Sequence, residues 1–349
     1  MEIKRYPVVK NDPLQGWDSA DELLLSHVRT LNLAQKRILI INDHFGALSC
    51  GIMGQDITSY TDSFVSAQAI KLNSENKIHP IHDLNALSAI YDYVLIQIPK
   101  NMSYFEDILC HLSEHLGPHS QVICASMVKH LAPTSFDLLN KYIGETTTSL
   151  AKKKARLIFA KFQKSKIESP YPKSIQIEGF DEPFVNYSNV FSREKLDIGT
   201  RFFLEHIPQG TFSKILDLGC ANGVVGRKAQ LLNPKSQIIF SDESWMGILS
   251  AKANNVQGEF LWTNCYENQP AHSIDLVLCN PPFHQQTTIG DFIARQMFQD
   301  AFHVLKKGGI LRVIGNSHLG YQVLLKKIFG KSQIIATNQK FIICEAQKE

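Results

Sequence analysis

The pattern of apolar and polar positions repeats along the chain in two long stretches. The first begins at residues 36–52, where a short Ile/Leu run meets Asn42, Asp43 and Gly46 and is followed by further apolar residues. The second begins at residues 213–232 and has the same succession of strand, polar or glycine-containing turn, and helix. Strands that alternate with helices are typical of a parallel sheet with helices on both faces. The pattern therefore predicts an α/β fold built from two similar domains.

Four blocks of the first stretch can be laid over four blocks of the second, in the same order and at similar spacing. The paired blocks are 38–46 with 215–223, 59–73 with 240–254, 91–100 with 274–283, and 105–126 with 297–316. We interpret this agreement as an internal duplication. The alternative is that any two doubly wound domains share such a layout.

The two copies differ at the positions that can carry chemistry. The differing pairs, second copy against first, are Asp217 and Ile40, Gly219 and Asn42, and residues 280–283 (NPPF) and 97–100 (QIPK). The first copy keeps the sheet pattern without the chemical residues. We therefore predict that it is a degenerate domain that serves as a scaffold or holds RNA.

A basic segment, residues 150–166, lies between the copies. Leu157, Ile158 and Phe162 give it a narrow apolar face at helical spacing, which predicts an amphipathic helix. It is either a solvated helix or a surface that contacts phosphates. The candidate RNA-binding residues are Lys152, Lys153, Lys154, Arg156 and Lys161. The predicted organisation is a degenerate domain at 1–149, the basic helix and a proline-containing linker at 150–188, and a catalytic domain at 189–349.

Length and composition agree with two globular domains. The chain has 349 residues, and domains usually contain roughly 100–200. Apolar residues make up 44% and charged residues 20%, as in ordinary soluble proteins. The net charge of +3 is too small to identify a nucleic-acid partner. Apolar runs stay short of the roughly 18 residues that span a bilayer, and the first residues lack the apolar core of a signal peptide. We expect a cytoplasmic protein without a membrane partner.

The cysteines give no sign of a metal or disulfide framework. The seven are scattered at 50, 110, 124, 220, 265, 279 and 344, and no pair has CxxC spacing. We expect buried thiols and no metal site.

The glycine-containing turn at 215–226 is the first motif with a chemical meaning. Gly219 and Gly223 permit a sharp turn and let a ligand approach the backbone, although their spacing differs from the GxGxxG dinucleotide fingerprint. The next predicted strand ends at Asp242, where an acid can accept both hydroxyls of a ribose. Asp217 can hold an ammonium group directly or through water. Each acid alone could be a helix N-cap or loop acid, but the set favours a nucleoside cofactor.

The NPPF motif at 280–283 is the second. Proline fixes its own φ and pushes the preceding residue toward an extended conformation, so this strand end is stiff. The Asn280 side-chain oxygen and the Pro281 carbonyl can accept the two N–H groups of a nucleobase amine and make its nitrogen more tetrahedral. Such preorganised dipoles act through fixed orientation. Phe283 can stack on the base. The alternative is a turn with a core aromatic residue.

Together these motifs resemble class I S-adenosylmethionine-dependent methyltransferases that modify amino groups. Segments 189–208, 240–244, 278–286 and 335–346 resemble the bacterial ribosomal RNA guanine-N2 methyltransferases, and most nearly those of the large-subunit (23S) rRNA. Those enzymes have two tandem Rossmann-like methyltransferase domains, of which only the C-terminal one binds the cofactor. Ala221 departs from the family pattern, in which many members have a glycine nearby.

The resemblance implies S-adenosylmethionine as the cofactor and the target guanine at 280–283. The candidate catalytic residues are Asn280, Pro281 and Phe283. The candidate cofactor-binding residues are Asp217, Gly219, Cys220, Gly223, Asp242, Asn264, Phe191 and Gly199. The last three rest on resemblance to the fold, since composition alone suggests loop, linker and helix-start positions.

The expected function is therefore guanine-N2 methylation of 23S rRNA by a monomer, on a base that is unpaired or flipped out. Methylation of 16S rRNA uses the same chemistry and remains an alternative. Protein glutamine and DNA adenine methyltransferases also use NPP[FY], and a non-catalytic RNA-binding assembly factor is a more distant alternative. The glycine spacing disfavours an NAD-dependent oxidoreductase.

Overall fold

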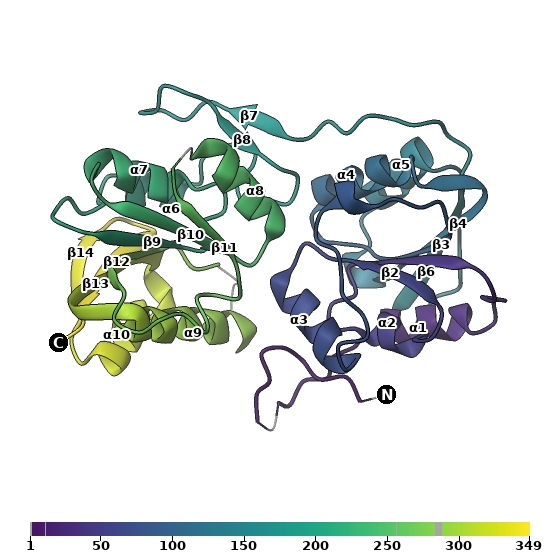
Figure 1. Cartoon of the computed structure of the whole chain (residues 1–349), viewed down its shortest axis with the longest axis horizontal. Helices are drawn as coiled ribbons and strands as arrows, with labels where there is room; N and C mark the ends of the chain where they lie inside the picture. Colours follow the sequence, from purple (N-terminus) through teal and green to yellow (C-terminus); the bar gives the residue numbers. More distant parts are fainter. Residues whose placement is uncertain (1, 11, 256, 283–287) are drawn as a thin grey trace. The chain divides into compact units, whose positions relative to one another are not determined.

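The computed structural model describes residues 2–10, 12–255, 257–282 and 288–349. The chain divides into two compact units, Met1–Tyr171 and Pro172–Glu349, each of which contains a sheet with helices on both faces (Figure 1). Each unit is described by itself.

The sheet of the first unit has the strand order β2-β1-β3-β4-β6-β5. Strands β2, β1, β3 and β4 are parallel to one another, whereas β6 runs antiparallel to both of its neighbours. The strands in chain order are β1 Arg37–Ile41, β2 Asp56–Tyr60, β3 Tyr91–Gln97, β4 Leu116–Met127, β5 Thr146–Thr148 and β6 Ala155–Lys161.

The helices of the first unit are α1 Ser19–Val28, α2 Ala47–Gly51, α3 Phe64–Asn73, α4 Met102–Leu112 and α5 Pro133–Tyr142, with short 3-10 turns η1 Leu84–Ala86 and η2 Val128–His130. Helix α1 begins at a capping box, in which the Asp18 carboxylate accepts the Ala20 and Asp21 N–H groups and Asp21 accepts the Asp18 N–H. Its buried face packs Leu24 and Val28 in one cluster with residues of β1 and β3.

The second unit repeats this plan with the order β11-β10-β9-β12-β13-β15-β14. Strands β11, β10, β9, β12 and β13 are parallel to one another, and β15 is antiparallel to both β13 and β14. The strands in chain order are β9 Lys214–Leu218, β10 Gln237–Asp242, β11 Glu259–Trp262, β12 Ile274–Cys279, β13 Leu305–Asn316, β14 Gln333–Thr337 and β15 Phe341–Gln347. A separate antiparallel pair, β7 Lys173–Ile175 and β8 Phe184–Asn186, precedes them.

The helices of the second unit are α6 Ile198–Leu204, α7 Val224–Leu232, α8 Trp245–Asn254, α9 Thr288–Val304 and α10 Tyr321–Phe329, with the 3-10 turn η3 Ser317–Leu319. Figure 1 shows α6, α7 and α8 on one side of the sheet and α9 and α10 on the other. Alternate strand residues follow this division. Leu216 and Val277 join the cluster with α9 and α10, whereas Ile215 and Leu278 join the cluster with α6, α7 and α8.

Matching details support the predicted duplication. The order β2-β1-β3-β4-β6-β5 corresponds to β10-β9-β12-β13-β15-β14 of the second unit. Helices α3 and α8 begin at equivalent serines, Ser63 and Ser244, whose hydroxyls accept the N–H groups of Ser66 and Gly247 at 3.1 Å in both cases. The predicted two-copy α/β arrangement is confirmed.

The predicted basic helix at 150–166 is wrong. Residues Ala155–Lys161 form β6, which pairs along its length with β4 and belongs to the first compact unit. Leu157, Ile158 and Ala160 are buried in this strand. A continuous apolar run of this kind suits a strand covered on both faces. The spacing of Leu157, Ile158 and Phe162 is compatible with a helix and the unbroken apolar run from 157 to 160 with a buried strand, and periodicity alone does not separate the two cases.

The lysines before β6 form a tight turn. Lys152 and Ala155 exchange two backbone hydrogen bonds, both of 2.9 Å. Lys153 and Lys154 between them have φ angles of +49° and +61°. Two-residue hairpin turns with positive φ at both central positions usually contain Asn-Gly, because other residues pay a steric cost in the left-handed region. The sequence therefore places two charged residues where glycine is favoured.

Replacing Lys154 by glycine should stabilise the protein. Lys154→Gly removes the left-handed strain at one turn position and should raise the free energy of unfolding by about 1 kcal/mol. Urea unfolding at constant ionic strength measures the shift. Lys154→Ala removes the same charge but keeps the Cβ atom, so it should give no comparable gain. Equal gains in the two variants would show that charge, and not backbone strain, is responsible.

Candidate active site

The carboxyl ends of β9, β10, β11 and β12 lie along one edge of the second sheet, because these strands are parallel neighbours. Open α/β sheets bind ligands beyond this edge. The predicted site residues that end or follow these strands are Gly219, Cys220, Asp242, Asn264 and Asn280. The fold thus brings the glycine turn, the predicted ribose-binding acid and the start of the NPPF motif to a single edge.

The glycine turn is held against β10. The N–H groups of Gly219 and Cys220 both donate to the Ser241 carbonyl, each at 2.9 Å. Gly219 and Gly223 have φ angles of +76° and +77°, which glycine adopts without steric cost. A Cβ atom on Gly223 would lie 2.5 Å from Nδ2 of Asn255. The Cys220 side chain is buried, and burial raises the pKa of its thiol, so Cys220 supports the turn through its backbone.

Asp242 connects the end of β10 to the glycine turn. Its Oδ1 accepts the Ser244 N–H at 2.9 Å and its Oδ2 accepts the Ala221 N–H at 2.8 Å. Ala221 has a φ of +48°, and this hydrogen bond supports its left-handed conformation. Burial raises the pKa of Asp242, while the backbone N–H donors act in the opposite direction. Each carboxylate oxygen retains capacity to accept a further hydrogen bond.

Asp217 lies deeper than Asp242. Its side chain is 3% exposed, and its Oδ2 accepts the N–H of Gly226 in the first turn of α7 at 2.7 Å. Burial raises the pKa of Asp217 to about 8, with a smaller contribution from the negative charge of Asp242. At neutral pH the carboxyl is therefore largely protonated, and it ties β9 to α7.

Asn264 occupies the turn after β11, next to Asp242. It is 7% exposed, and its Nδ2 donates to Oε2 of Glu267 at 3.0 Å. The preceding residue, Thr263, donates its N–H to the Asp242 carbonyl at 3.0 Å. The strand ends that carry Asp242 and Asn264 are therefore joined directly.

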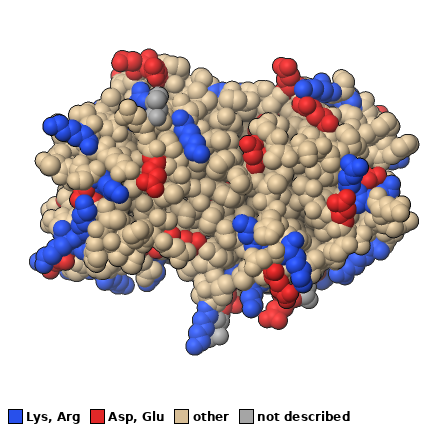
Figure 2. All heavy atoms as spheres, in the orientation of Figure 1, with Lys and Arg blue, Asp and Glu red and all other residues tan. Residues whose placement is uncertain are grey.

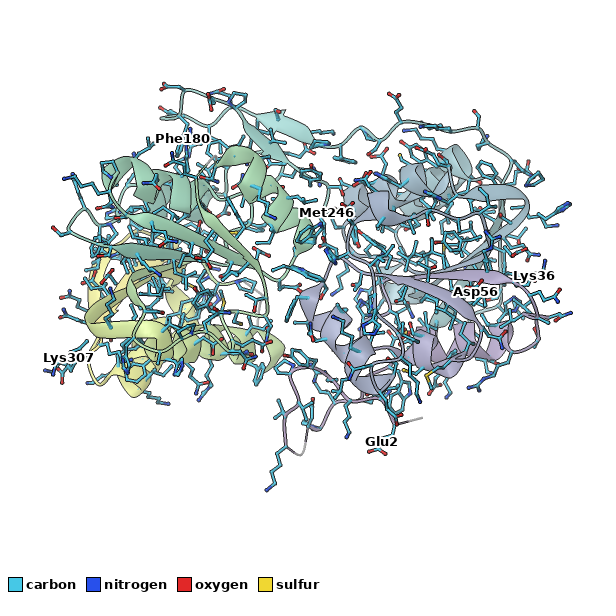
Figure 3. The ribbon with its side chains drawn as sticks, viewed as in Figure 1. Glu2, Lys36, Asp56, Phe180, Met246 and Lys307 are labelled. Carbon is cyan, nitrogen blue, oxygen red and sulfur yellow. The ribbon has the colours of Figure 1, made fainter. Side chains whose placement is uncertain are left out.

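The segment between β8 and α6 (residues 187–197) is tied to the glycine turn through Asn186. This fully buried side chain accepts from Asn222 Nδ2 at 2.9 Å and donates to the Arg193 carbonyl at 3.1 Å. Ser188 contacts Met246 of α8 through a hydroxyl–sulfur hydrogen bond of 3.1 Å. Met246 is labelled in Figure 3. Sequence reasoning missed Asn186 and Asn222, because the sequence shows them only as polar residues in expected loops.

Two predicted residues in and after this segment have different surroundings. Phe191 is 57% exposed. Gly199 is in α6, where a Cβ atom would lie 2.9 Å from Cε1 of Phe341. Gly199 therefore allows α6 to pack closely on β15.

Asn280 follows β12 on the side of the sheet that α6 covers. Its Nδ2 donates to Oγ1 of Thr200, in α6, at 3.0 Å. Its Oδ1 is buried and has no hydrogen-bond partner among the described residues. Pro281 is buried and Pro282 is exposed, whereas Phe283 lies outside the described residues. Thr200 is a further site residue that sequence reasoning missed, since it is 80 positions from Asn280 in the chain.

The predicted RNA-binding residues lie on β6 and the turn before it. Lys152, Lys153, Lys154 and Lys161 are exposed, and Lys153 forms an ion pair of 2.7 Å with Glu22. Arg156 is partly buried, and its Nε has no partner in the part of the chain that the structure describes. On the face drawn in Figure 2, basic and acidic side chains are interspersed over the surface.

The equivalent turn of the first unit is closed by an acid. The Asp43 carboxylate accepts the N–H groups of Gly46, Leu48 and Ser49 at 3.1, 3.3 and 2.7 Å. Asp43 is at the position of Cys220 in the second copy. The carboxylate therefore occupies the turn itself.

Aromatic side chains fill the space beside this turn. Tyr60 and Tyr104 are 0% and 4% exposed, and the Tyr104 hydroxyl donates to Oδ1 of Asn42 at 2.9 Å. Gln97, at the position of Asn280, donates through Nε2 to the buried Asp21 carboxylate at 2.5 Å. These contacts explain physically why the first copy is degenerate at the edge where the second carries its candidate site.

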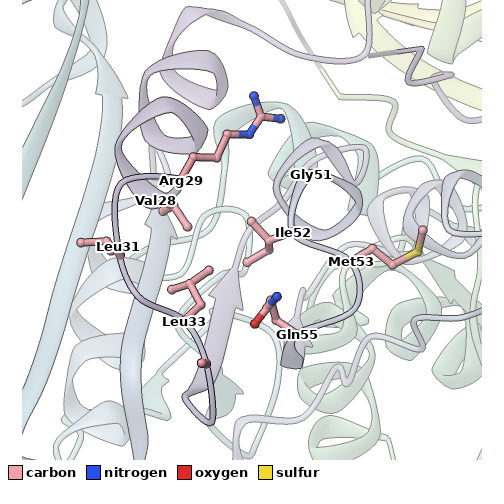
Figure 4. A pocket seen from close by; sticks show the side chains of 9 residues that line it. Val28, Arg29, Leu31, Leu33, Gly51, Ile52, Met53 and Gln55 are labelled. Atoms are coloured by element: carbon pink, nitrogen blue, oxygen red, sulfur yellow. The ribbon is translucent and has the colours of Figure 1, made fainter.

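A pocket of about 400 Å³ in the first unit lies elsewhere. It is bounded by Val28, Leu33 and Ile52, near the amino ends of β1 and β2 (Figure 4). Within the described part of the chain, no group of three or more His, Cys, Asp or Glu side chains is placed to hold a metal ion. A search of the same residues finds no helix both long and apolar enough to cross a membrane.

Comparison with known proteins covers both units. Residues 1–164 match the family model of the RLMG N-terminal domain, and residues 181–345 match the methyltransferase small domain. "Ribosomal RNA large subunit methyltransferase G" of Psychromonas ingrahamii is 42% identical over 99% of this chain and 96% of its own length. The protein of the same name from Vibrio vulnificus is 43% identical over 99% and 96%, and that from Stutzerimonas stutzeri is 41% identical over 100% and 97%.

A solved structure has the same fold over nearly the whole chain. It is the T. thermophilus 16S rRNA N2 G1207 methyltransferase (RsmC) in complex with AdoMet and guanosine. The TM-score is 0.81 at 19% identity, with 95% of this chain and 92% of the other covered. The predicted tandem arrangement of two methyltransferase-like domains is thereby confirmed.

Asp217→Asn should change how stability depends on pH. Because the folded-state pKa of Asp217 is about 8 against a usual value of 3.8, its favourable contribution is complete below pH 4 and is lost as the pH rises through 8. Asparagine cannot ionise but keeps an oxygen for the Gly226 N–H. The melting temperatures of the variant and of the unchanged protein are measured without cofactor from pH 4 to pH 8. The difference, variant minus unchanged protein, should increase over this range. A difference that is constant over this range would contradict the raised pKa.

Proposed function

We propose a substrate and a reaction for this chain, which belongs to the ribosomal RNA large subunit methyltransferase G family. The chain is a methyltransferase that uses S-adenosylmethionine. The proposed reaction is methylation of the exocyclic N2 of a guanine in large-subunit rRNA. The observation that carries this proposal is Oδ1 of Asn280, which is buried without a hydrogen-bond partner among the described residues, at the strand edge that also carries the glycine turn.

The residues at this edge fit a nucleoside cofactor. Gly219 and Gly223 hold a left-handed turn whose backbone a ligand can approach, and Asp242 keeps acceptor capacity for two ribose hydroxyls. We assign Asn264 to the neighbouring end of the cofactor, because its strand end is joined to that of Asp242. The other assigned residues are Asp217, Cys220, Phe191 and Gly199.

Asp217 differs in one respect from its sequence-based assignment. The sequence suggested an acid that holds an ammonium group, and the buried carboxyl has a pKa raised to about 8. A neighbouring cation would favour ionisation and lower this pKa. Binding of the amino-acid end of the cofactor near Asp217 would therefore release a proton.

Asn280 and Pro281 prepare the attacking nitrogen. The lone pair of a guanine amine is delocalised into the ring, and the nitrogen must become more tetrahedral before it can react. The Asn280 Oδ1 and the Pro281 carbonyl would each accept one of its N–H groups and favour that change. The cofactor would supply a methyl group on a positively charged sulfur. As the N–CH3 bond forms and the S–CH3 bond breaks, S-adenosylhomocysteine would be left, and the methylated nitrogen would then lose a proton to water to give N2-methylguanine. We also assign Phe283, which lies outside the described residues, to stacking on the base.

Several exposed lysines of the first unit suit contact with rRNA phosphates. Lys154 is joined to η2 by a hydrogen bond of 2.8 Å from the Val128 N–H to its carbonyl. Lys129 in η2 and Lys100 after β3 both contribute positive charge at His130. Lys152 completes this basic cluster at the carboxyl edge of the first sheet. We propose that the cluster holds rRNA through sequence-independent phosphate contacts, with Lys153 and Arg156 nearby; Lys161, at the other end of β6, would be a separate contact.

Asn280→Ala tests the proposed chemistry. Removing one preorganised group typically costs about 2.7–4 kcal/mol, or roughly 10²- to 10³-fold in turnover, so methyl transfer from labelled S-adenosylmethionine to unmethylated 23S rRNA should fall by that factor. Cofactor affinity measured by calorimetry should stay nearly unchanged. Protein-free 16S rRNA is the control substrate. Full turnover by the variant would overturn the proposal. So would a failure of the protein without the substitution to methylate either RNA.

Lys152→Ala/Lys154→Ala tests the basic cluster. The loss of two phosphate contacts should raise KM for rRNA without lowering kcat, and should reduce the slope of log KM against log salt by between 1 and 2, since each contact adds roughly 0.7–0.9. Lys326→Ala/Lys327→Ala removes two exposed lysines from α10 and is the matched control. Equal effects in the two double variants would show that only net charge matters.

A further inference from the structure

A chain of hydrogen bonds connects Asn280 to the start of α6. Asp197 is the N-cap of this helix, and its Oδ2 accepts the Thr200 N–H at 2.9 Å. The same oxygen accepts the Thr200 hydroxyl at 3.3 Å. The Thr200 oxygen in turn accepts Nδ2 of Asn280 at 3.0 Å. Thr200 is 6% exposed, so water has little access to compete with these bonds.

The chain has a direction. An ionised carboxylate can only accept, so the single hydroxyl proton of Thr200 is directed to Asp197. The Thr200 oxygen is then left with lone pairs only and can accept but not donate toward Asn280. The Asn280 nitrogen must therefore face Thr200, because the opposite orientation would set two acceptors against each other.

Packing alone selects poorly between the two orientations of an amide, because its oxygen and nitrogen are similar in size. The hydrogen bond to Thr200 therefore sets the orientation of Asn280. With the nitrogen on Thr200, the Oδ1 is turned away, and there it is buried without a partner among the described residues. Buried polar atoms without partners are rare in folded proteins, and each calls for an explanation.

We propose that Thr200 is the positioning residue that turns the Asn280 oxygen toward the target amine. The inference rests on the proposed function and deepens it. If the amide were reversed, its NH₂ group would meet the NH₂ group of the guanine, and two donors would face each other. Asp197 acts one step further back by directing the hydroxyl proton away from Asn280.

The test compares Thr200→Val with Thr200→Ser in the full-length protein. Valine keeps the shape of the side chain but removes the acceptor for the Asn280 nitrogen. The Asn280 amide would then favour the reversed orientation, in which its nitrogen points away from residue 200. We expect kcat for methyl transfer to 23S rRNA to fall about 10- to 100-fold, with KM for the RNA, cofactor affinity and melting temperature nearly unchanged. Serine restores the oxygen and should recover most of the lost turnover. If valine prevents folding, Thr200→Ala takes its place with the same expectations.

A double-mutant cycle separates positioning from a general structural role. If Thr200 acts through Asn280, Thr200→Val should cause no further loss in protein that already carries Asn280→Ala. An equal loss in both backgrounds would overturn the inference, as would unchanged turnover in Thr200→Val while Asn280→Ala is impaired. Full activity of Asn280→Ala would instead overturn the proposed role of Asn280 itself, so the two failures are distinguishable.

Discussion

In both domains one backbone N–H group at the carboxyl edge of the sheet requires a hydrogen-bond acceptor. A left-handed turn ends at Gly46 or Gly223, a helix follows, and the N–H of its third residue needs an acceptor. In the second domain Asp217, on the strand below, accepts the Gly226 N–H at 2.7 Å. In the first, Asp43, within the turn, accepts the Ser49 N–H at the same distance. Either acid supplies the acceptor that the helix N–H group needs. Asp217 does so from the strand and leaves the turn open, whereas Asp43 occupies the turn.

This difference explains how one repeated architecture can leave its turn open in the second copy and fill it in the first. Once Asp43 closes the turn, Tyr60 and Tyr104 can pack beside it, and the Tyr104 hydroxyl contacts both Oδ1 of Asn42 and the Tyr60 hydroxyl. The second copy instead keeps Asp217 and the Asn280 oxygen in arrangements that burial makes costly. The cost is concentrated at the edge where the reaction is proposed, as expected for a functional site.

The sequence predicted the fold and the central site where the signals were local. Apolar runs followed by turn residues located β9, β10 and β12, and parallel pairing then placed Gly219, Asp242 and Asn280 at one edge without further information. The helical spacing of Leu157, Ile158 and Phe162 gave a wrong prediction for β6, because the burial of this segment comes from its pairing with β4, which the local sequence does not show. Thr200 and Asn186 could not be found, since their partners are distant in the sequence and an isolated Thr or Asn carries no motif.

The NPPF motif fixes less than its rigidity suggests. Its prolines restrict the backbone, and so they determine where the Cα of Asn280 lies. The terminal torsion of an asparagine remains roughly two-fold, and neither proline selects between its two orientations. That choice needs a neighbour that accepts without donating, and Thr200 becomes such a neighbour only because Asp197 takes its proton. The stiff strand end therefore fixes the backbone position of Asn280, and the cap of α6 fixes the orientation of its amide. The acceptor geometry proposed for the guanine amine needs both.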